Sequence, residues 1–146
     1  MEVLIGFSGA VESLILQEVL KMKKIQMFSK EFQAEMGWEI SDENFEKTRA
    51  SLLNNYMLLS TEVAEVAEEL RKMFNITYQL KQEGMDEQEA FEQAKGQVKE
   101  EVGKELADCI AYLMKLYNFF ELDAEKSFYN KMEEVKNRTN KDVTKK

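Results

Sequence analysis

The sequence predicts an all-α protein, and three observations support that prediction. The chain of 146 residues contains no proline and only six glycines, the two residue types that most often break helices and shape the turns between strands. Apolar residues recur three or four positions apart over long stretches, which is helical spacing. Hydrophobic residues make up 44% and charged residues 33% of the chain, a balance typical of globular proteins. We therefore expect a four-helix bundle in one domain over residues 1–146, with 1–8 and 141–146 peripheral.

Interruptions in the apolar periodicity divide the chain into four predicted helices. These cover about residues 11–36, 44–81, 87–120 and 124–140. In the segment GWEISDEN, Ser41 or Asp42 is expected to cap the second helix. In KQEGMDEQ, Gly84 is expected to end the second helix and Asp86 to cap the third. The third helix contains Gly96 and Gly103, which weaken its first half, so that it could form as two pieces.

Bulk properties exclude several classes of protein. The net charge of −8 argues against a partner made of nucleic acid polymer, which needs a basic face. No apolar run reaches the roughly 20 residues of a membrane span, and the opening MEVLIGF is too short for a signal-peptide core. The single cysteine excludes an internal disulfide framework and suits a reducing compartment. We expect a cytoplasmic protein with no membrane partner.

The absence of histidine restricts the chemistry further. Ser-His-Asp and Cys-His catalysis are impossible without it, as are the Glu-x-x-His di-iron sites of helical bundles. A histidine-based zinc site is also excluded, and one cysteine cannot supply a four-cysteine site. A metal in this chain must be held by oxygen ligands, which favours Mg²⁺, Mn²⁺ or Ca²⁺.

Acidic residues with helical spacing form the candidate site. In STEVAEVAEEL, Glu62 and Glu65 lie on one face of the predicted helix, because successive residues turn by about 100°. In EEVGKELADCIAYL, Glu105 and Asp108 likewise share a face. Two helices packed side by side could bring these four carboxylates together, where they would repel one another unless a divalent cation neutralised them. The alternative is a solvated acidic face, as expected of a helical interaction module with no catalytic activity.

The two acidic motifs resemble those of the MazG-type nucleotide pyrophosphohydrolases, the all-α NTP pyrophosphatase superfamily. That family carries ExxE on one helix and ExxD on the next, matched here by Glu62 and Glu65 and by Glu105 and Asp108. The resemblance implies a four-helix MazG-like bundle in which these residues bind Mg²⁺, with Mn²⁺ as an alternative, and the Mg²⁺ holds a nucleoside triphosphate. It further implies a glutamate, Glu65 rather than Glu62, that orients or deprotonates the attacking water.

Other segments resemble the dCTP pyrophosphatase branch of this family. IQMFSKEFQAEMGWE is similar to its first helix, which ends in an acidic-aromatic corner with tryptophan, here Trp38. Tyr112 matches an aromatic position, and NKMEEVKNR matches a phosphate-binding segment through Lys131 and Arg138. The family's asparagine in that segment is replaced by Val135. The stretch between Glu65 and Glu105, including residues 81–100, is longer than usual in the family.

Several of these residues also have a structural interpretation. Trp38 could stack on a base or serve as an apolar anchor, and Tyr112 could be a core residue. Asn55 interrupts an apolar face two turns before Glu62, and it could line a pocket or face solvent. Phe28, Phe32 and Tyr56 are expected in the core, although a pocket for the base could also use them.

The resemblance implies hydrolysis of a nucleoside triphosphate to the monophosphate and pyrophosphate, with dCTP or a related pyrimidine deoxynucleotide as substrate and nucleotide-pool cleansing as the role. A relative acting on dUTP or phosphoribosyl-ATP is the enzymatic alternative. The enzymes that the chain resembles are dimers or dimers of dimers. A helix of about 35 residues is about 50 Å long, so we expect a homo-oligomer, dimer or tetramer, that packs through its long helices.

Overall fold

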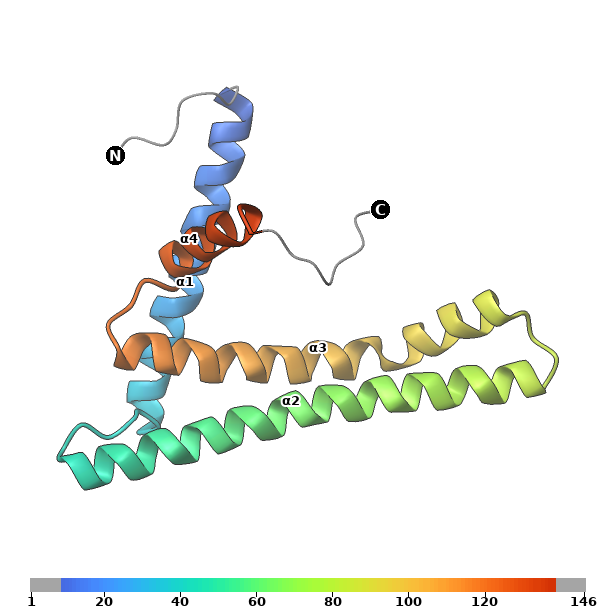
Figure 1. The fold of residues 1–146 in the computed structure, drawn as a ribbon, viewed down its shortest axis with the longest axis horizontal. Helices are drawn as coiled ribbons and strands as arrows, with labels where there is room; N and C mark the ends of the chain where they lie inside the picture. Colours follow the sequence, from blue (N-terminus) through green and yellow to red (C-terminus); the bar gives the residue numbers. More distant parts are fainter. Residues whose placement is uncertain (1–8, 139–146) are drawn as a thin grey trace. The chain divides into compact units, whose positions relative to one another are not determined.

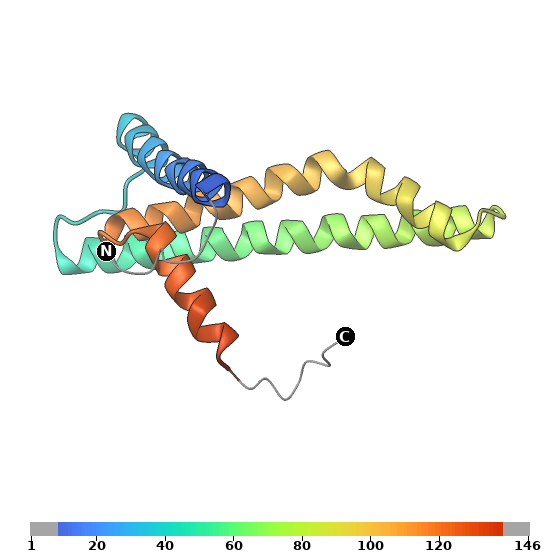
Figure 2. The same ribbon diagram turned by 90° about the horizontal axis from the view of Figure 1, so that it is seen from above.

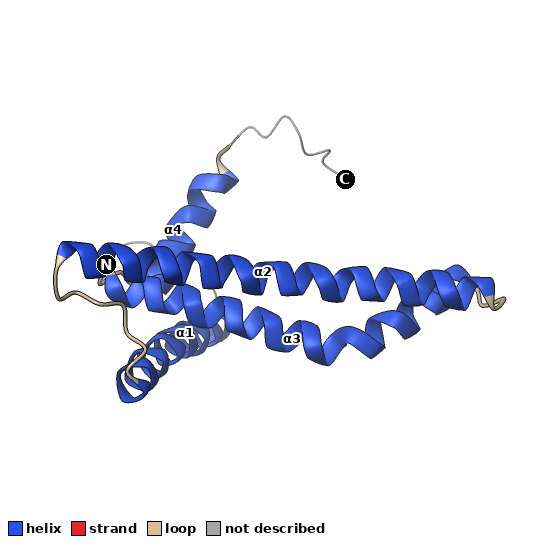
Figure 3. Ribbon diagram, turned by 90° about the horizontal axis from the view of Figure 1, so that it is seen from below, coloured by secondary structure: helices blue, strands red, loops and turns tan. Residues whose placement is uncertain are grey.

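The computed structural model describes residues 9–138, with side chains from Met22 onward. This part of the chain forms four helices and no strand (Figures 1 and 3). They are α1 (Gly9–Met36), α2 (Phe45–Gln82), α3 (Glu87–Phe119) and α4 (Ala124–Lys136). The predicted helix count and order are confirmed. The fourth helix ends four residues before its predicted end, at Lys136, followed by the C-cap Asn137.

Polar side chains cap the N-termini of α2, α3 and α4, but the predicted cap of α2 is wrong. Asp86 caps α3 by accepting hydrogen bonds from the backbone N–H groups of Gln88 and Glu89, at 3.0 and 3.3 Å. For α2 the cap is Asn44, whose side chain accepts from the Lys47 N–H at 3.0 Å, rather than Ser41 or Asp42. Ser41 instead donates its backbone N–H to the Ser51 hydroxyl at 3.1 Å, which draws the preceding loop back along α2.

Three helices end with a residue in the left-handed conformation. Gly84 follows α2 with φ 98°. There the N–H groups of Gly84 and Met85 donate to the carbonyls of Lys81 and Leu80, the two-bond pattern that closes a helix C-terminus. Gly37 ends α1 in the same way, with φ 68°. After α3 this position is occupied by Glu121, with φ 53°, a conformation that costs a non-glycine residue roughly 1–2 kcal/mol.

The chain divides into two compact units, one of Met1–Trp38 with Tyr117–Lys146 and the other of Glu39–Leu116. The prediction of a single domain stays a prediction. The second unit is an antiparallel hairpin of α2 and α3 (Figure 2). Its core near the hairpin turn contains Met73, Ala94 and Val98, with Ile76, Phe91 and Val102 packed around them. Helix α3 is continuous across Gly96 and Gly103, although Figure 2 shows that it bends within this region.

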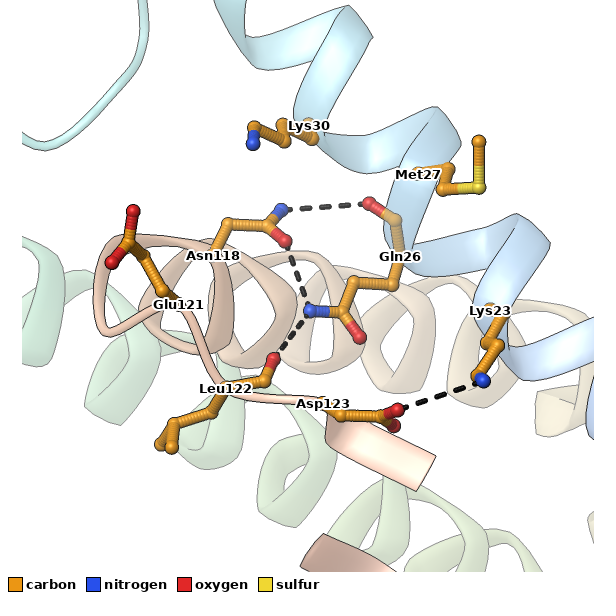
Figure 4. A pocket seen from close by; sticks show the side chains of 8 residues that line it. All are labelled: Lys23, Gln26, Met27, Lys30, Asn118, Glu121, Leu122 and Asp123. Carbon is orange, nitrogen blue, oxygen red and sulfur yellow. Dashed lines mark hydrogen bonds and ion pairs between the residues drawn. The ribbon is translucent and has the colours of Figure 1, made fainter. Parts of the chain in front are cut away.

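In the first unit, Gln26 ties α1 to the corner between α3 and α4 (Figure 4). Its amide nitrogen donates to Asn118 Oδ1 at 3.1 Å and to the Leu122 carbonyl at 2.8 Å. Its amide oxygen accepts from the Ala124 N–H at 3.1 Å. One side chain therefore satisfies a carbonyl after α3 and an N–H in the first turn of α4, groups that the helices themselves leave unpaired.

Large apolar side chains remain exposed on both units. The expectation that Phe28, Phe32 and Tyr56 belong to the core is wrong for the chain as described, since they are 67%, 40% and 64% exposed. The physical reason is that periodicity marks every apolar stripe of a helix, whereas a helix buries only the stripe that packs against a neighbour. Tyr56 lies outside the stripe of α2 that is buried in the hairpin, and Phe28 and Phe32 lie on α1 in the other unit. Within residues 9–138, no helix combines the length and apolarity needed to cross a membrane.

Candidate metal and nucleotide site

The buried stripe of α2 has the spacing of a coiled coil, but its side chains change from acidic to apolar along the helix. From Asn55 to Leu80, side chains recur at alternating steps of four and three residues, as in two helices packed side by side. The buried or half-buried members are Asn55, Leu59, Glu62, Val66, Glu69, Met73, Ile76 and Leu80. The facing stripe of α3 includes Ala94, Val98, Glu101, Glu105, Cys109 and Tyr112. The seam is apolar near the hairpin turn and strongly acidic beyond it.

Three carboxylates converge in the acidic part of the seam. Glu62 of α2 and Glu105 and Asp108 of α3 each offer an oxygen, and these oxygens lie within 4.8 Å of one another. Glu62 and Glu105 are half-buried and Asp108 is exposed. The structure therefore brings together three of the four acidic residues predicted from the two motifs. We refer to Glu62, Glu105 and Asp108 as the acidic triad.

Glu65, the fourth predicted residue, is exposed and lies outside this group. Helical geometry explains the difference, because Glu62 occupies a seam position and Glu65 is displaced from it by about 60°. Glu65 is still close enough for its charge to help raise the pKa of Glu105. It therefore borders the triad, where it could act on a group held there.

Negative charge from its acidic neighbours dominates the surroundings of Glu105, although Lys104, which pairs with Glu101, is close enough for the charge of Glu105 to help raise its pKa. Burial raises the pKa of Glu105 above its usual value, and Glu62, Glu65, Asp108 and Glu101 raise it further. Burial also raises the pKa of Cys109 and of Tyr112, and the charges of Glu62 and Asp108 add to both shifts. A carboxylate surrounded by like charges holds its proton more tightly. The triad thus favours the arrival of a positive charge.

Acidic residues elsewhere in the seam are neutralised by lysines. Glu69 forms an ion pair with Lys72 at 3.5 Å. Glu101 forms one with Lys104 at 2.7 Å, and Lys104 also reaches Glu100 at 3.3 Å. In the described part of the chain, no lysine or arginine forms an ion pair with a triad member. This contrast distinguishes the triad from the other acidic seam residues, Glu69 and Glu101, each of which meets a lysine three residues away on its own helix.

The donor atoms of the triad fit a divalent cation with oxygen ligands. Mg²⁺ binds oxygen at about 2.0–2.1 Å in octahedral geometry, so adjacent ligands of one ion lie about 2.9 Å apart and opposite ligands about 4.2 Å apart. Oxygens within 4.8 Å of one another need only small rotations of the side chains to reach those spacings. Carboxylates are the ligands that Mg²⁺ and Mn²⁺ prefer.

Two more of the predicted residues, Tyr112 and Asn55, lie in the same hairpin. The charges of Glu62 and Asp108 influence the Tyr112 hydroxyl, so Tyr112 borders the triad. Asn55 is 4% exposed; its amide nitrogen donates to the Ser51 carbonyl at 2.8 Å, and its Oδ1 has no hydrogen-bond partner. The alternative that Asn55 faces solvent is therefore wrong. A buried hydrogen-bond acceptor without a donor lowers the stability of the fold. The Oδ1 atom of Asn55, two helical turns before Glu62, is therefore free to accept a hydrogen bond from a ligand.

The remaining predicted residues belong to the other unit. Trp38 is 54% exposed and packs edge-on against Phe32, with ring centroids 5.8 Å apart. Lys131 forms an ion pair with Glu134 at 2.8 Å, and Arg138 pairs with the same carboxylate. Their proposed contacts with a nucleotide stay predictions.

Sequence reasoning missed Lys115, which lies beside Tyr112 with its Nζ 5.9 Å from the centre of the ring. The sequence spacing could have indicated it, because Lys115 follows Asp108 by seven residues and Tyr112 by three, which keeps all three on one helix face.

Comparisons with models of protein families, with curated proteins and with solved structures found no match to this chain.

Proposed function

We propose that this protein is a Mg²⁺-dependent nucleoside triphosphate pyrophosphohydrolase of the MazG type. It would cleave between the α and β phosphates and release a nucleoside monophosphate and pyrophosphate. The observation that carries the proposal is the acidic triad, with three carboxylate oxygens within 4.8 Å of one another, two of them from half-buried seam residues, and no lysine or arginine paired to them among the described residues. An acidic cluster kept without a counter-ion favours a cation as its ligand.

In this proposal each carboxylate has a separate task. Glu62, Glu105 and Asp108 would hold Mg²⁺, which supplies charge neutralisation at the phosphates and a lowered pKa for a bound water. Glu65, exposed at the border of the triad, would orient the attacking water and accept its proton. Glu65 suits this role because it is not needed to complete the triad.

The remaining contacts follow from the charges of the substrate. Lys131 and Arg138 would bind phosphate oxygens, exchanging their present partner Glu134 for the more strongly charged triphosphate. Tyr112 and Asn55 would contact the sugar or base, and Trp38 would stack on the base. We propose dCTP or a related pyrimidine deoxynucleotide as substrate, with cleansing of the nucleotide pool as the physiological role.

Assembly into a homo-oligomeric bundle is part of the proposal. Helix α2 has 38 residues, about 57 Å at 1.5 Å per residue. It buries one stripe against α3 but leaves Leu53, Met57 and Val63 more than half exposed. A second copy packed along this side would bury apolar surface that otherwise contacts water. Light scattering at micromolar concentration should give the mass of a dimer or tetramer, and a monomer would contradict the assembly.

The activity is tested by incubating the protein with Mg²⁺ and a panel of nucleoside triphosphates and measuring pyrophosphate. We expect release that depends on Mg²⁺, is abolished by a chelator and is fastest with dCTP. Replacing Mg²⁺ with Mn²⁺ tests the choice of metal. The Glu68→Gln variant is a matched control, because Glu68 is an exposed carboxylate on the same helix that pairs with Arg71 at 2.7 Å. If no nucleotide yields pyrophosphate, the exposed apolar faces favour a helical interaction module instead.

A further inference from the structure

Lys115 occupies the same face of α3 as two members of the candidate site. It lies seven residues after Asp108 and three after Tyr112, within a narrow sector of the helix. Its side chain is half-buried, and its Nζ lies 5.9 Å from the centre of the Tyr112 ring. The hydroxyl end of Tyr112 lies within the influence of Glu62 and Asp108. Along α3, Tyr112 therefore lies between Asp108 of the triad and Lys115.

Lys115 differs from the other unpaired lysines of the described chain in being half-buried. Lys24, Lys30, Lys99 and Lys126 also form no ion pair, but all four are exposed to solvent. Burial lowers the pKa of Lys115, and no carboxylate offsets that shift. The contact with the Tyr112 ring face offsets only part of the hydration that the ammonium group loses on burial, because a cation–π contact is weaker than a charged hydrogen bond. The chain has 28 acidic residues against 20 basic ones, and yet among the residues whose side chains the structure describes this cation has no carboxylate partner.

Lys115 lies about two helical turns from Asp108 of the triad. Seven residues of α-helix correspond to about 10 Å along the axis, and the lysine side chain shortens the gap to a ligand above the helix. An ammonium group offers donors and no acceptor, and its strongest complement is an anionic oxygen. We propose that Lys115 is an additional anion-binding residue, which donates to a phosphate oxygen of the nucleotide whose metal-bound end lies at Glu62, Glu105 and Asp108. Identifying the anion as a nucleotide rests on the proposed function.

Tyr112 acquires a role in this arrangement as a positioning residue. Its ring face lies beside the Lys115 ammonium, and the charges of Glu62 and Asp108 act on its hydroxyl. Because the ring contact does not require the hydroxyl, Tyr112→Phe should preserve the effect of Lys115, whereas Tyr112→Ala should reduce it.

The experiment is a calorimetric titration of the full-length protein with magnesium tripolyphosphate, which has phosphates but neither sugar nor base. We expect Lys115→Gln to weaken binding about tenfold or more, the effect of losing a charged hydrogen bond. Lys115→Arg should retain most of the affinity, because it keeps the charge. The matched control is Lys99→Gln, which removes an exposed, unpaired lysine from the same helix and should bind like the original protein. The KM for dCTP should rise by the same factor in Lys115→Gln, with kcat less affected.

Thermal unfolding of the ligand-free variants separates a binding role from a structural one. Lys115→Gln should leave the melting temperature unchanged or higher, since it removes a half-buried charge without a counter-ion. A clear drop in melting temperature together with unchanged tripolyphosphate affinity would overturn the inference. So would weaker binding of dCTP with unchanged binding of tripolyphosphate, which would assign Lys115 to the base or sugar.

The two proposals can fail separately. If the protein binds magnesium tripolyphosphate through Lys115 but hydrolyses no nucleotide, the anion site stands and the pyrophosphohydrolase proposal fails. If the protein hydrolyses dCTP and Lys115→Gln binds tripolyphosphate normally, the activity stands and the role of Lys115 is overturned. Failure of the original protein to bind magnesium tripolyphosphate also overturns the role of Lys115.

Discussion

Glu62 of α2 and Glu105 of α3 face each other across the helical seam, with carboxylate oxygens within 4.8 Å, and the charge of Glu62 raises the pKa of Glu105. Two carboxylates this close destabilise each other when both are ionised. A hydrophobic pair at the same seam positions would stabilise the hairpin instead. The chain thus has two mutually repelling carboxylates at seam positions, where apolar residues would pack better. Residues that lower local stability in this way are expected at functional sites.

The first prediction concerns the pH dependence of stability without metal. The pKa of Glu105 is higher in the folded state than its ordinary value of 4.5, so the folded protein holds this proton more tightly than the unfolded chain. Protonation of Glu105 therefore stabilises the folded state below about pH 4.5, and this stabilisation is lost as the pH rises through the pKa that Glu105 has in the folded state. Glu105→Gln should therefore melt at a higher temperature than the original protein at pH 7 in the presence of a chelator.

That advantage of Glu105→Gln should shrink as the pH falls toward 4.5, where Glu105 itself becomes neutral. The measurement is the difference in melting temperature between the two proteins at each pH, which removes the contribution of all other titrating groups. Glu68→Gln is the control, and its difference should stay small. An advantage for Glu105→Gln that grows as the pH falls would contradict the assigned shift.

The second prediction concerns turnover. Glu65→Gln should lower kcat for dCTP by a hundredfold or more, roughly the contribution of a positioned general base, with little change in Mg²⁺ affinity. Asp108→Asn should lower kcat and also raise the Mg²⁺ concentration needed for activity, because Asp108 belongs to the triad. Circular dichroism should show unchanged helicity in both variants. If either variant turns over dCTP at the original rate, the role assigned to that residue is wrong.

The sequence predicts the four helices well because their ends depend on local chemistry. Gly84 and Asp86 act on backbone groups within a few residues of themselves, so their roles can be read from neighbouring letters. The cap of α2 is different, because Ser41, Asp42 and Asn44 are all suitable residues. The choice among them depends on the contact between Ser41 and Ser51, ten residues away, which no local pattern specifies.

The candidate site is only partly predictable for a related reason. The spacing of ExxE and ExxD places each pair on one helix face, but the register between the helices decides which carboxylates meet. In this hairpin Glu62 reaches Glu105 and Asp108, while Glu65 does not. The exposure of Phe28 and Tyr56 shows the same limit, since periodicity identifies an apolar face without identifying what covers it.

The third prediction concerns the strained position after α3. Glu121 has φ 53°, where glycine has no steric penalty. Glu121→Gly should raise the free energy of unfolding by up to about 1 kcal/mol, because the relief of strain exceeds the entropy that glycine loses on folding. Urea denaturation would measure this as a higher midpoint.

Two control variants isolate the backbone effect at Glu121. Glu121→Ala removes the same side chain but keeps the strain, so it should give no comparable gain. Gly84→Ala should be destabilising by about 1 kcal/mol, because Gly84 has φ 98°. A Cβ added there would meet no other atom within 4 Å, so the loss would come from backbone strain alone. Equal effects of Glu121→Gly and Glu121→Ala would assign the change to the side chain instead.

The fourth prediction concerns recognition of the base by Trp38. Its indole is 54% exposed and contacts Phe32 edge-on, which leaves ring surface available for stacking. Trp38→Ala should raise the KM for dCTP by roughly ten- to a hundredfold, the effect of losing one base–aromatic stack, and should reduce discrimination among bases. Trp38→Phe should retain most of both. An unchanged preference across the nucleotide panel would make Trp38 an apolar anchor.

The last prediction tests whether the acidic triad binds metal, independently of any activity. A ligand that binds only the folded state stabilises it by about 2.7 kcal/mol at a hundredfold excess over its dissociation constant. For a chain of this size, that corresponds to a rise of several degrees in melting temperature. Millimolar Mg²⁺ should produce such a rise, and NaCl at matched ionic strength should produce a smaller one, since screening alone relieves only part of the repulsion.

Variants of the triad distinguish specific binding from general screening. Glu105→Gln/Asp108→Asn should lose the additional response to Mg²⁺, and it should melt higher than the original protein in the presence of a chelator, because two repelling charges are gone. Glu68→Gln, which removes one exposed carboxylate paired with Arg71, should keep the full response. Equal responses of the original protein to Mg²⁺ and NaCl would mean that the triad does not bind the ion, and the pyrophosphohydrolase proposal would then lose the observation that carries it.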